Sequence, residues 1–329
     1  MKRRISISLL AAAFLIAGFL FLTGDRAEAA EGKWKHNKTG WWYEYPDGSY
    51  ATGWLKWEGK WYYFLSSGYM ETSGYRQGYW IGKNGAVNMK YAGGRWRKDK
   101  NGWWFRDQTG WYPRKQWLKI NGTEYYFDVE GYLATNQWIG QYCVNEEGVW
   151  DPDASTDWAQ EYMNDIEVFQ AVSLELWGDS YQPEYSLIYL DEDSTPELVL
   201  HVGDYQTQTE VRTFVSDRTL TCECNSGSIV YEPRKGLFKD DTMIGDKRTV
   251  VVYQLKDNAF QTLGSGTEVV PRQEGEYAIF SWNGETVSEE EFRDSILQVY
   301  PEESTHLMIT YVSYDKIRET LYKITRKKG

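Results

Sequence analysis

Pairs of tryptophans recur seven residues apart in the first half of this 329-residue chain. The pairs are Trp34 and Trp41, Trp54 and Trp61, and Trp96 and Trp103. In each pair the second tryptophan begins a short aromatic run that resembles a β-strand. Ring faces attract cations, above all a quaternary ammonium, which has no hydrogen-bond donor of its own. The spacing therefore predicts aromatic ligand sites, although the same rings can also form the core of a thin repeat structure.

Short β-hairpins are the elements that must position these rings. Residues 53–68 predict one hairpin, with a turn at Glu58-Gly59 and a second turn at Ser67-Gly68. Residues 32–87 align with residues 94–150 over their turn glycines and aromatic runs. A single hairpin of this length is marginal in water, so successive hairpins must pack on one another. The repeat predicts a β-hairpin solenoid.

The start of the chain has the features of a secretory signal peptide. Lys2-Arg3-Arg4 precede an apolar run from Ile5 to Leu22, and Ala27-Glu28-Ala29 forms a small-x-small cleavage site. We expect residues 1–29 to be removed, with a membrane anchor as the alternative. No later stretch is apolar enough to span a bilayer, so we expect no integral membrane protein after cleavage.

Charge and aromatic content divide the mature chain near residue 150. Residues 32–150 carry 16 Lys and Arg against 11 Asp and Glu, whereas residues 151–329 carry 16 against 34. Fourteen of the 17 tryptophans lie in the first of these segments. We therefore predict an aromatic repeat domain over residues 30–150 and an acidic domain over residues 151–329.

The repeated pattern Gly-Trp-x6-Trp-Tyr-Tyr-Phe-x3-Gly over residues 53–68 resembles the cell-wall-binding repeats of the choline-binding family. It is also similar to the glucan-binding repeats of streptococcal glucosyltransferases and to the repeats of clostridial toxins. In the choline-binding family, two tryptophans of one hairpin and an aromatic residue of the next form a cage for the choline of teichoic acid. The resemblance covers roughly residues 32–150.

Carried over residue by residue, this resemblance implies three cages. They are Trp34, Trp41 and Tyr63; Trp54, Trp61 and Trp80; and Trp96, Trp103 and Tyr126. A fourth set keeps Trp117 but has Glu124 and Cys143 in place of the other two rings, so we expect no ligand there. The first two sets depart from the simplest motif, which leaves three ligands open: choline, an undecorated polyanionic wall polymer or a glucan. Lys and Arg distributed among the rings suit a polyanion. Export argues against nucleic acid.

The acidic half predicts an α+β fold, which makes the whole chain mainly β plus α+β, with a C-terminal antiparallel sheet and flanking helices. A helix with one apolar face is expected from Ser155 to about Leu176, and a capping box predicts another from Ser288. A last helix is expected over residues 314–324. The expected strands are residues 185–190, 197–202, 211–215, 228–231, 249–255 and 277–282.

The conspicuous motif of the acidic half is an acidic loop that ends in Pro196-Glu197-Leu198. It is similar to loops found in many uncharacterised secreted proteins of Firmicutes. Asp191, Asp193 and Glu197 form a weak calcium candidate, since carboxylates at alternate positions can gather around calcium, but the EF-hand pattern fails at Thr195 and Pro196. A solvated acidic turn is the alternative, and no other cofactor is predicted.

Catalytic motifs are missing from the sequence. It contains neither Gly-x-Ser-x-Gly nor His-Glu-x-x-His, and His201 and His306 lie in apolar runs that favour buried structural imidazoles. We expect Cys143, Cys222 and Cys224 to be small buried residues, with one adventitious thiol as the alternative. The chain is thus predicted to be a secreted surface protein attached noncovalently to the cell wall of a Gram-positive bacterium. The alternatives are a repeat-targeted wall or glycan hydrolase and a glucan-binding adhesin.

Overall fold

The computed structural model of the protein describes residues 32–203, 208–225, 229–271, 277–301 and 307–326. The signal segment predicted over residues 1–29 and His306 therefore lie outside the described residues. The chain divides into two compact units, residues 1–73 with 81–87 and residues 74–80 with 88–329. Among the helices of the described residues, none is both long enough and apolar enough to cross a membrane.

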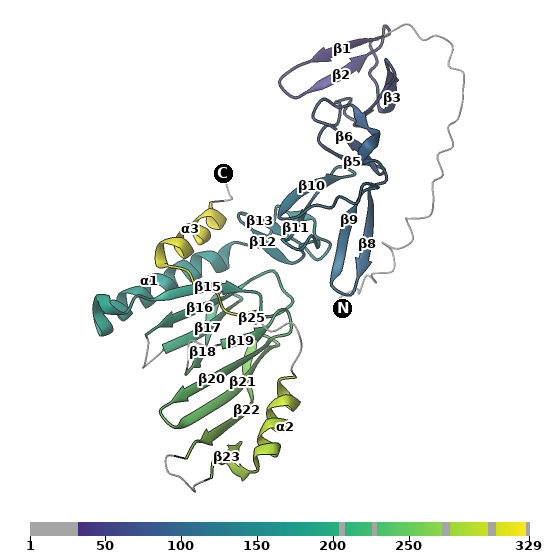
Figure 1. The fold of residues 1–329 in the computed structure, drawn as a ribbon. Helices are drawn as coiled ribbons and strands as arrows, with labels where there is room; N and C mark the ends of the chain where they lie inside the picture. Colours follow the sequence, from purple (N-terminus) through teal and green to yellow (C-terminus); the bar gives the residue numbers. More distant parts are fainter. Residues whose placement is uncertain (1–31, 204–207, 226–228, 272–276, 302–306, 327–329) are drawn as a thin grey trace, which may run out of the picture. The chain divides into compact units, whose positions relative to one another are not determined.

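Two antiparallel hairpins lie in the first unit (Figure 1). Their strands are β1 (Lys33–His36), β2 (Trp41–Glu44), β3 (Gly53–Trp57) and β4 (Lys60–Phe64). Glu58 and Gly59 both have positive φ, of 45° and 78°, and form the tight turn that the sequence predicts between β3 and β4. The hairpins pack on one another through a core that contains Tyr43, Tyr62 and Phe64.

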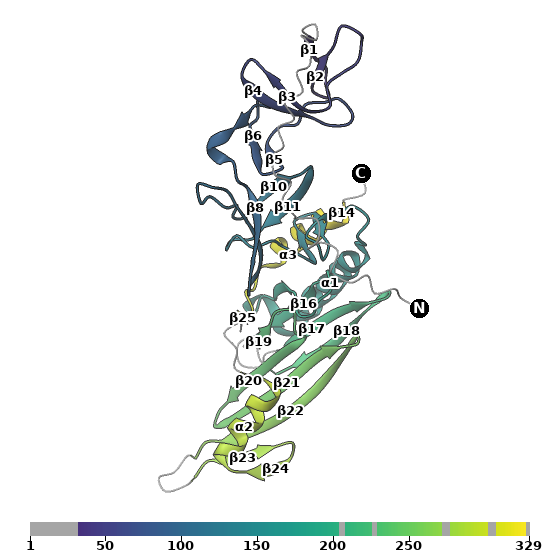
Figure 2. The ribbon, with the colours of Figure 1, turned by 90° about the vertical axis from the view of Figure 1, so that its right-hand side faces the viewer.

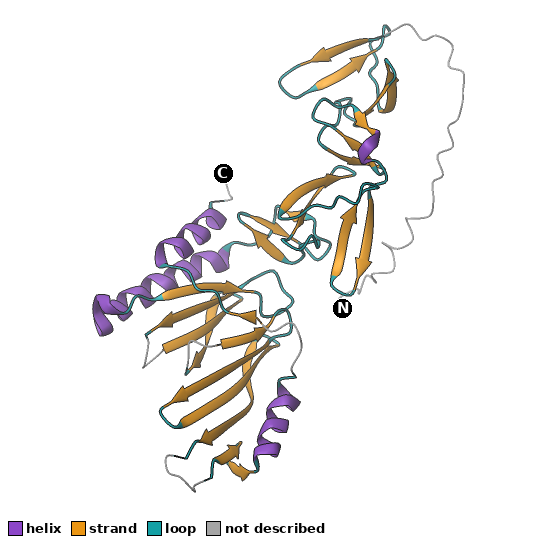
Figure 3. Cartoon of the chain, in the orientation of Figure 1, coloured by secondary structure: helices purple, strands orange, loops and turns teal. Residues whose placement is uncertain are grey.

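Further short strands continue the repeat pattern; they lie in the second unit except for Ile81 of β6 and Val87 of β7 (Figure 3). They are β5 (Gly74–Arg76), β6 (Tyr79–Ile81), β7 (Val87–Asn88), β8 (Arg95–Asp99), β9 (Gly102–Arg106), β10 (Gln116–Ile120), β11 (Thr123–Phe127), β12 (Gln137–Ile139), β13 (Tyr142–Val144) and β14 (Trp150–Asp151), with a 3-10 turn, η2 (Met89–Tyr91). Tyr75, Phe105, Leu118, Ile120 and Phe127 are buried in their common core. The predicted β-hairpin repeat is therefore confirmed as a series of short strands, paired antiparallel except for the parallel contact between β5 and β10.

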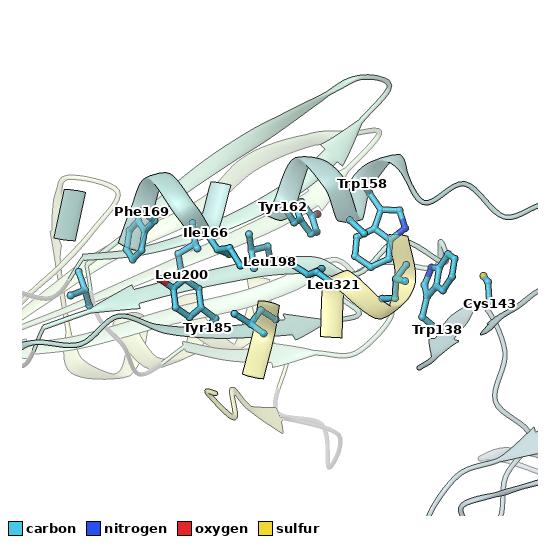
Figure 4. Packing of buried hydrophobic residues seen from close by; sticks show 14 residues of the cluster. Trp138, Cys143, Trp158, Tyr162, Ile166, Phe169, Tyr185, Leu198, Leu200 and Leu321 are labelled. Carbon is cyan, nitrogen blue, oxygen red and sulfur yellow. The ribbon is translucent and has the colours of Figure 1, made fainter. Parts of the chain in front are cut away.

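A four-stranded antiparallel sheet, covered on one face by two helices, begins the acidic half (Figure 2). The helices are α1 (Asp157–Trp177) and α3 (Tyr314–Thr325), and η3 (Gly178–Ser180) follows α1. The strands are β15 (Glu184–Ile188), β16 (Glu197–Val202), β17 (Gln208–Val215) and β18 (Arg218–Cys224). The predicted apolar face of α1 packs on this sheet (Figure 4), although Leu176 at its end is 64% exposed.

The second sheet of the acidic half has seven strands in the order β24-β23-β22-β21-β20-β19-β25. They are β19 (Ile229–Glu232), β20 (Leu237–Ile244), β21 (Lys247–Lys256), β22 (Ala259–Val269), β23 (Ile279–Trp282), β24 (Glu285–Val287) and β25 (Leu307–Met308). Helix α2 (Glu289–Val299) begins at the predicted capping box, in which the Ser288 hydroxyl accepts a hydrogen bond from the Glu291 amide. Phe292 fixes the helix to the sheet, with its ring 5.5 Å from the ring of Phe280.

The predicted fold class is confirmed, but the prediction missed five strands of the acidic half, β18, β20, β22, β24 and β25. Strand β20 shows the reason. Lys239, Asp240 and Asp241 follow one another in it, and Asp240 is only 1% exposed because it accepts hydrogen bonds from Asn225 and Thr242. A strand with buried polar side chains lacks the apolar alternation that identifies strands in a sequence.

A candidate aromatic ligand site

Four aromatic rings of the first unit line an open cavity at the surface, with a volume of about 320 Å³. Its lining residues are Trp34, Trp41, Trp57, Tyr62, Met70 and Asn84. None of the six is charged, so the cavity offers ring faces, one thioether and one amide. A site of this composition suits a small cation that cannot donate hydrogen bonds.

Trp34 is the centre of this ring cluster. Its ring centroid lies 6.4 Å from that of Trp41, 5.6 Å from that of Trp57 and 5.1 Å from that of Tyr62. The interplanar angles are 77°, 80° and 68°, so the neighbouring rings stand edge-on around it. The buried Nε1 of Trp34 has no hydrogen-bond partner among the described residues. A buried donor without a partner destabilises a fold and is unusual away from functional sites.

Strand alternation selects the residues that face the cavity. Successive side chains of a strand point to opposite faces, and directly paired residues of two strands share a face. In the hairpin β3–β4, Leu55 is paired with Tyr62 and Trp57 with Lys60, so Trp57 and Tyr62 lie on one face. Trp54 and Tyr63 are paired on the other face, with ring centroids 5.1 Å apart. Tyr62 therefore lines the cavity, and the predicted Tyr63 does not.

Backbone contacts position the remaining wall of the cavity. The amide of Met70 donates a hydrogen bond to the carbonyl of Trp41 over 2.7 Å. Gly85 lies beneath the Met70 side chain, and a Cβ on this glycine would be 2.2 Å from the sulfur. The φ of Gly85 is 77°, a conformation that glycine adopts without steric cost. A side chain at position 85 would therefore displace Met70 from the cavity.

The second copy of the repeat, residues 94–150, keeps only some of the residues that line the cavity in the first copy, residues 32–87. Trp96 takes the place of Trp34, with its ring 5.0 Å from Tyr125, the counterpart of Tyr62. Leu133 replaces Met70 and repeats its backbone bond, because its amide donates to the carbonyl of Trp103 over 2.7 Å. Ile120, however, stands where the first copy has Trp57. The second copy thus lacks one ring, and Glu147 stands where the first copy has Asn84.

The other predicted cage residues lie as follows. The ring of Tyr126 packs on Trp117 at 5.4 Å, on the face of its hairpin away from Trp96. Trp54 and Trp61 belong to the first unit, whereas Trp80 belongs to the second and packs on Tyr75 at 5.2 Å. The set of Trp54, Trp61 and Trp80 thus stays a prediction.

Trp117, for which we expect no ligand, belongs to another ring cluster. Its ring lies 5.7 Å from that of Tyr142, which lies 5.9 Å from that of Trp150. Glu124 lies on the same face of the hairpin as Trp117 and is paired with Lys119, whose Nζ is 3.7 Å from its carboxylate. Cys143 is buried in the core that contains α1, so it offers no wall to a surface site.

The acidic loop holds a buried carboxylate and an arginine. Glu197 is 1% exposed and accepts hydrogen bonds from the Leu190 amide and the Thr213 hydroxyl. Burial, followed by the negative charge of Asp191, raises the pKa of Glu197 to about 8. The guanidinium of Arg234 donates to the carbonyls of Asp191 and Asp193. Within the described residues no three His, Cys, Asp or Glu side chains gather as metal ligands, and calcium has no part in the function proposed below.

The remaining candidates have structural surroundings. Nδ1 of His201 lies 2.9 Å from the Thr209 hydroxyl, and burial lowers the pKa of this imidazole. Cys143, Cys222 and Cys224 are buried and form no disulfide, as expected for small core residues. The sequence analysis missed Trp57, Tyr62, Met70 and Asn84 at the cavity. Trp57 and Tyr62 could have been identified from the sequence, because strand alternation across the turn puts positions 55, 57, 60 and 62 on one face of the hairpin.

Two segments of the chain match known repeat families. Residues 112–150 match the family described as "Choline-binding repeat", and residues 52–70 match the one described as "Putative cell wall binding repeat". A curated protein of Streptococcus pneumoniae, "Putative endo-beta-N-acetylglucosaminidase", is 56% identical over 34 residues. This match spans 10% of the present chain and only 5% of the length of that protein.

Among solved structures, the chain is similar to the modular autolysin LytC from Streptococcus pneumoniae, at 31% identity over 38% of this chain and 29% of that one, with a TM-score of 0.19. It is similar to the choline binding domain of Spr1274 from the same organism, at 27% identity over 31% and 95% of the two chains, with a TM-score of 0.17. Residues 52–70 and 112–150 therefore belong to the choline-binding repeat family, which points to attachment at a cell wall.

Proposed function

We propose that this chain is exported and attaches noncovalently to the wall of a Gram-positive bacterium by holding the choline of a wall polymer in the cavity around Trp34. The repeats act as the anchor, and residues 151–329 form an acidic α+β module displayed at the surface. The activity proposed for the chain is binding, through the repeats.

The composition of the cavity carries this proposal. Four rings stand around a space of about 320 Å³, and the six lining residues include no charged side chain. A trimethylammonium group is a permanent cation, and ring faces attract it without the desolvation cost of an ion pair. The uncharged cavity explains why a cation of low hydration is favoured over a lysine-like ammonium, which would lose hydrogen bonds to water.

A glucan is the weaker candidate ligand. A sugar ring stacks on tryptophan, but its hydroxyls also need hydrogen-bonding groups at the same site. Three of the six lining residues have hydrogen-bonding side chains: Asn84 has an amide, Tyr62 a hydroxyl and Trp34 the buried Nε1. These groups can bond only a few of the hydroxyls of a sugar. The ring cluster therefore favours a quaternary ammonium over a polyhydroxylated ligand.

Retention of the full chain on an immobilised quaternary-amine resin tests the proposal. We expect release by free choline and not by high salt, because contacts with ring faces are short-ranged whereas polyanion attraction is screened. Trp41→Ala removes a ring that is 46% exposed at the cavity, and it should weaken choline binding about tenfold, since a partly desolvated cation–ring contact contributes about 1 to 2 kcal/mol. Trp111→Ala is the matched control, because Trp111 is 38% exposed and outside the cavity.

The second copy of the repeat offers an internal comparison. Trp103 is 44% exposed, similar to Trp41, but its copy has Ile120 in place of a ring. Trp103→Ala should therefore reduce choline binding less than Trp41→Ala does. Equal losses in the two variants, or release of the wild type by salt alone, would contradict the cage around Trp34. A lytic band of the full chain on a cell-wall zymogram would instead support the hydrolase alternative.

A further inference from the structure

Four arginines lie on and beside the outer face of the hairpin β8–β9. Arg95 is paired directly with Arg106, and Arg97 is paired with Trp104, so these side chains share one face of the hairpin. Tyr112 connects Arg114 to this face. Its ring is 6.1 Å from the ring of Trp104 and 4.8 Å from the Arg114 guanidinium. All four arginines are exposed. We call Arg95, Arg97, Arg106 and Arg114 the arginine face.

The direct pairing of Arg95 with Arg106 is unfavourable for the hairpin by itself. Like charges directly opposite one another in an antiparallel pair repel and destabilise it. The first copy of the repeat avoids this cost, because Lys33 is paired with Glu44 at the equivalent positions. The second copy has thus replaced an attractive pair by a repulsive one.

The carboxylates near the arginine face have hydrogen-bond partners other than its arginines. Asp99 shares this face, but it accepts hydrogen bonds from the Asn101 amide and the Tyr132 hydroxyl. Asp107 is buried and accepts bonds from Thr109, Trp111 and Tyr75. Among the residues that the structure describes, none forms an ion pair with any of the four arginines.

Arginine is the side chain best suited to bind a phosphate. Its planar guanidinium donates two parallel hydrogen bonds to one phosphate, and it is less strongly hydrated than a lysine ammonium. Arg95 and Arg97, two residues apart on one strand, are spaced by about 7 Å along it, and Arg106 lies across from Arg95. Two such rows follow a linear polyanion better than they fit a single small ion.

We propose that the arginine face binds the phosphodiester backbone of a wall polymer. It would contact the same class of polymer as the choline site does, but through the phosphates of that polymer. The inference rests on the proposed function for its location at a cell wall, but it does not require an aromatic cage. A single-stranded nucleic acid also carries phosphodiesters, and its binding is an outcome that the test must separate.

The test measures binding of the full chain to immobilised synthetic poly(glycerol phosphate) that carries no choline, over a range from about 50 to about 500 mM salt. The double variant Arg95→Gln with Arg106→Gln should lose at least about tenfold in affinity at low salt. Its slope of log affinity against log salt should fall by about 1.4, or about 0.7 for each lost contact with a flexible polyanion. Lys33→Gln with Lys35→Gln, on the corresponding strand of the first copy, is the matched control and should change affinity less than twofold.

A second variant separates geometry from charge. Arg95→Lys with Arg106→Lys keeps both positive charges, so the salt slope should be retained while affinity falls several-fold. The proposal fails if the wild type does not bind the polymer, if the glutamine variant binds as the wild type does, or if an oligothymidylate of equal charge binds more tightly. Choline-resin retention is measured in parallel. If the wild type binds the polymer but is not retained on the choline resin, the result contradicts the cage. If the wild type is retained on the resin but does not bind the polymer, the result contradicts the arginine face.

Discussion

The indole rings of Trp138 and Trp158 lie 5.7 Å apart at an interplanar angle of 63° (Figure 4). Trp138 belongs to β12 of the last repeat, and Trp158 lies in the first turn of α1. Both are buried in the core cluster that also contains Cys143 and Tyr162. In addition, the amide of Trp138 donates a hydrogen bond to the Tyr189 hydroxyl over 2.6 Å. The last repeat and the acidic half therefore share one hydrophobic core.

Trp138→Ala should destabilise the acidic half, although the substitution lies in the repeats. Trp138 is only 9% exposed, and removing a buried tryptophan ring leaves a cavity that typically costs about 3 to 5 kcal/mol. Urea unfolding, monitored by the circular dichroism of the full chain, would measure the loss. Trp150→Ala, at a residue that is 44% exposed, is the control and should change the free energy of unfolding by less than about 1 kcal/mol. A similar loss of unfolding free energy in both variants would show that the contact between Trp138 and Trp158 does not couple the last repeat to the acidic half.

Arg234→Lys should loosen the acidic loop. The guanidinium stacks on the Tyr189 ring at 4.2 Å and donates to the carbonyls of Asn136 and Asp193, over 2.8 Å and 2.5 Å. A lysine ammonium cannot reproduce this planar fork, so we expect a loss of about 1 to 3 kcal/mol in the free energy of unfolding. Arg218→Lys, at an exposed arginine of β18, should be neutral. Faster amide hydrogen exchange at residues 191–195 in Arg234→Lys alone would locate the change.

The buried carboxyl of Glu197 should make stability fall with rising pH. Its folded-state pKa is raised from 4.5 to about 8, so its contribution is complete below about 4.5 and is lost as the pH rises through about 8. Glu197→Gln removes this titration and keeps an oxygen for the Leu190 amide. The stability of the variant relative to the wild type should therefore increase by up to about 1.4 kcal/mol per pH unit over that interval. Glu192→Gln, in the exposed part of the same loop, should show no such trend, and a pH-independent difference for Glu197→Gln would contradict the prediction.

Asn84→Glu should strengthen choline binding. Asn84 lines the cavity and is exposed, and the second copy of the repeat has Glu147 at the equivalent position. A carboxylate near a bound quaternary ammonium adds a screened attraction of about 0.5 kcal/mol, or two- to threefold in affinity. Titration calorimetry with choline would measure the gain, which should vanish in about 1 M salt. Asn84→Gln is the neutral control, and an equal gain in both variants would exclude the charge as its cause.

The sequence alone was sufficient to predict the repeat and its hairpins. Turn pairs such as Glu58-Gly59 can be recognised locally, because a two-residue turn with positive φ requires particular residues. The seven-residue spacing of Trp34 and Trp41 also follows from the length of one hairpin. The capping box at Ser288 and the helix of α1 were predicted for the same reason, since each depends on residues close together in the chain.

Only the tertiary structure decided which rings meet. Tyr62 and Tyr63 are adjacent in the sequence and similar in chemistry, yet strand pairing sends Tyr62 to the cavity and Tyr63 to Trp54. Asn84 reaches the same cavity from a separate turn, through a contact that no local pattern encodes. Likewise, Trp138 resembles the other repeat tryptophans in the sequence, and only packing against α1 makes it part of the core of the acidic half. Contacts between residues far apart in the chain depend on the packing of whole elements, which local spacing does not specify.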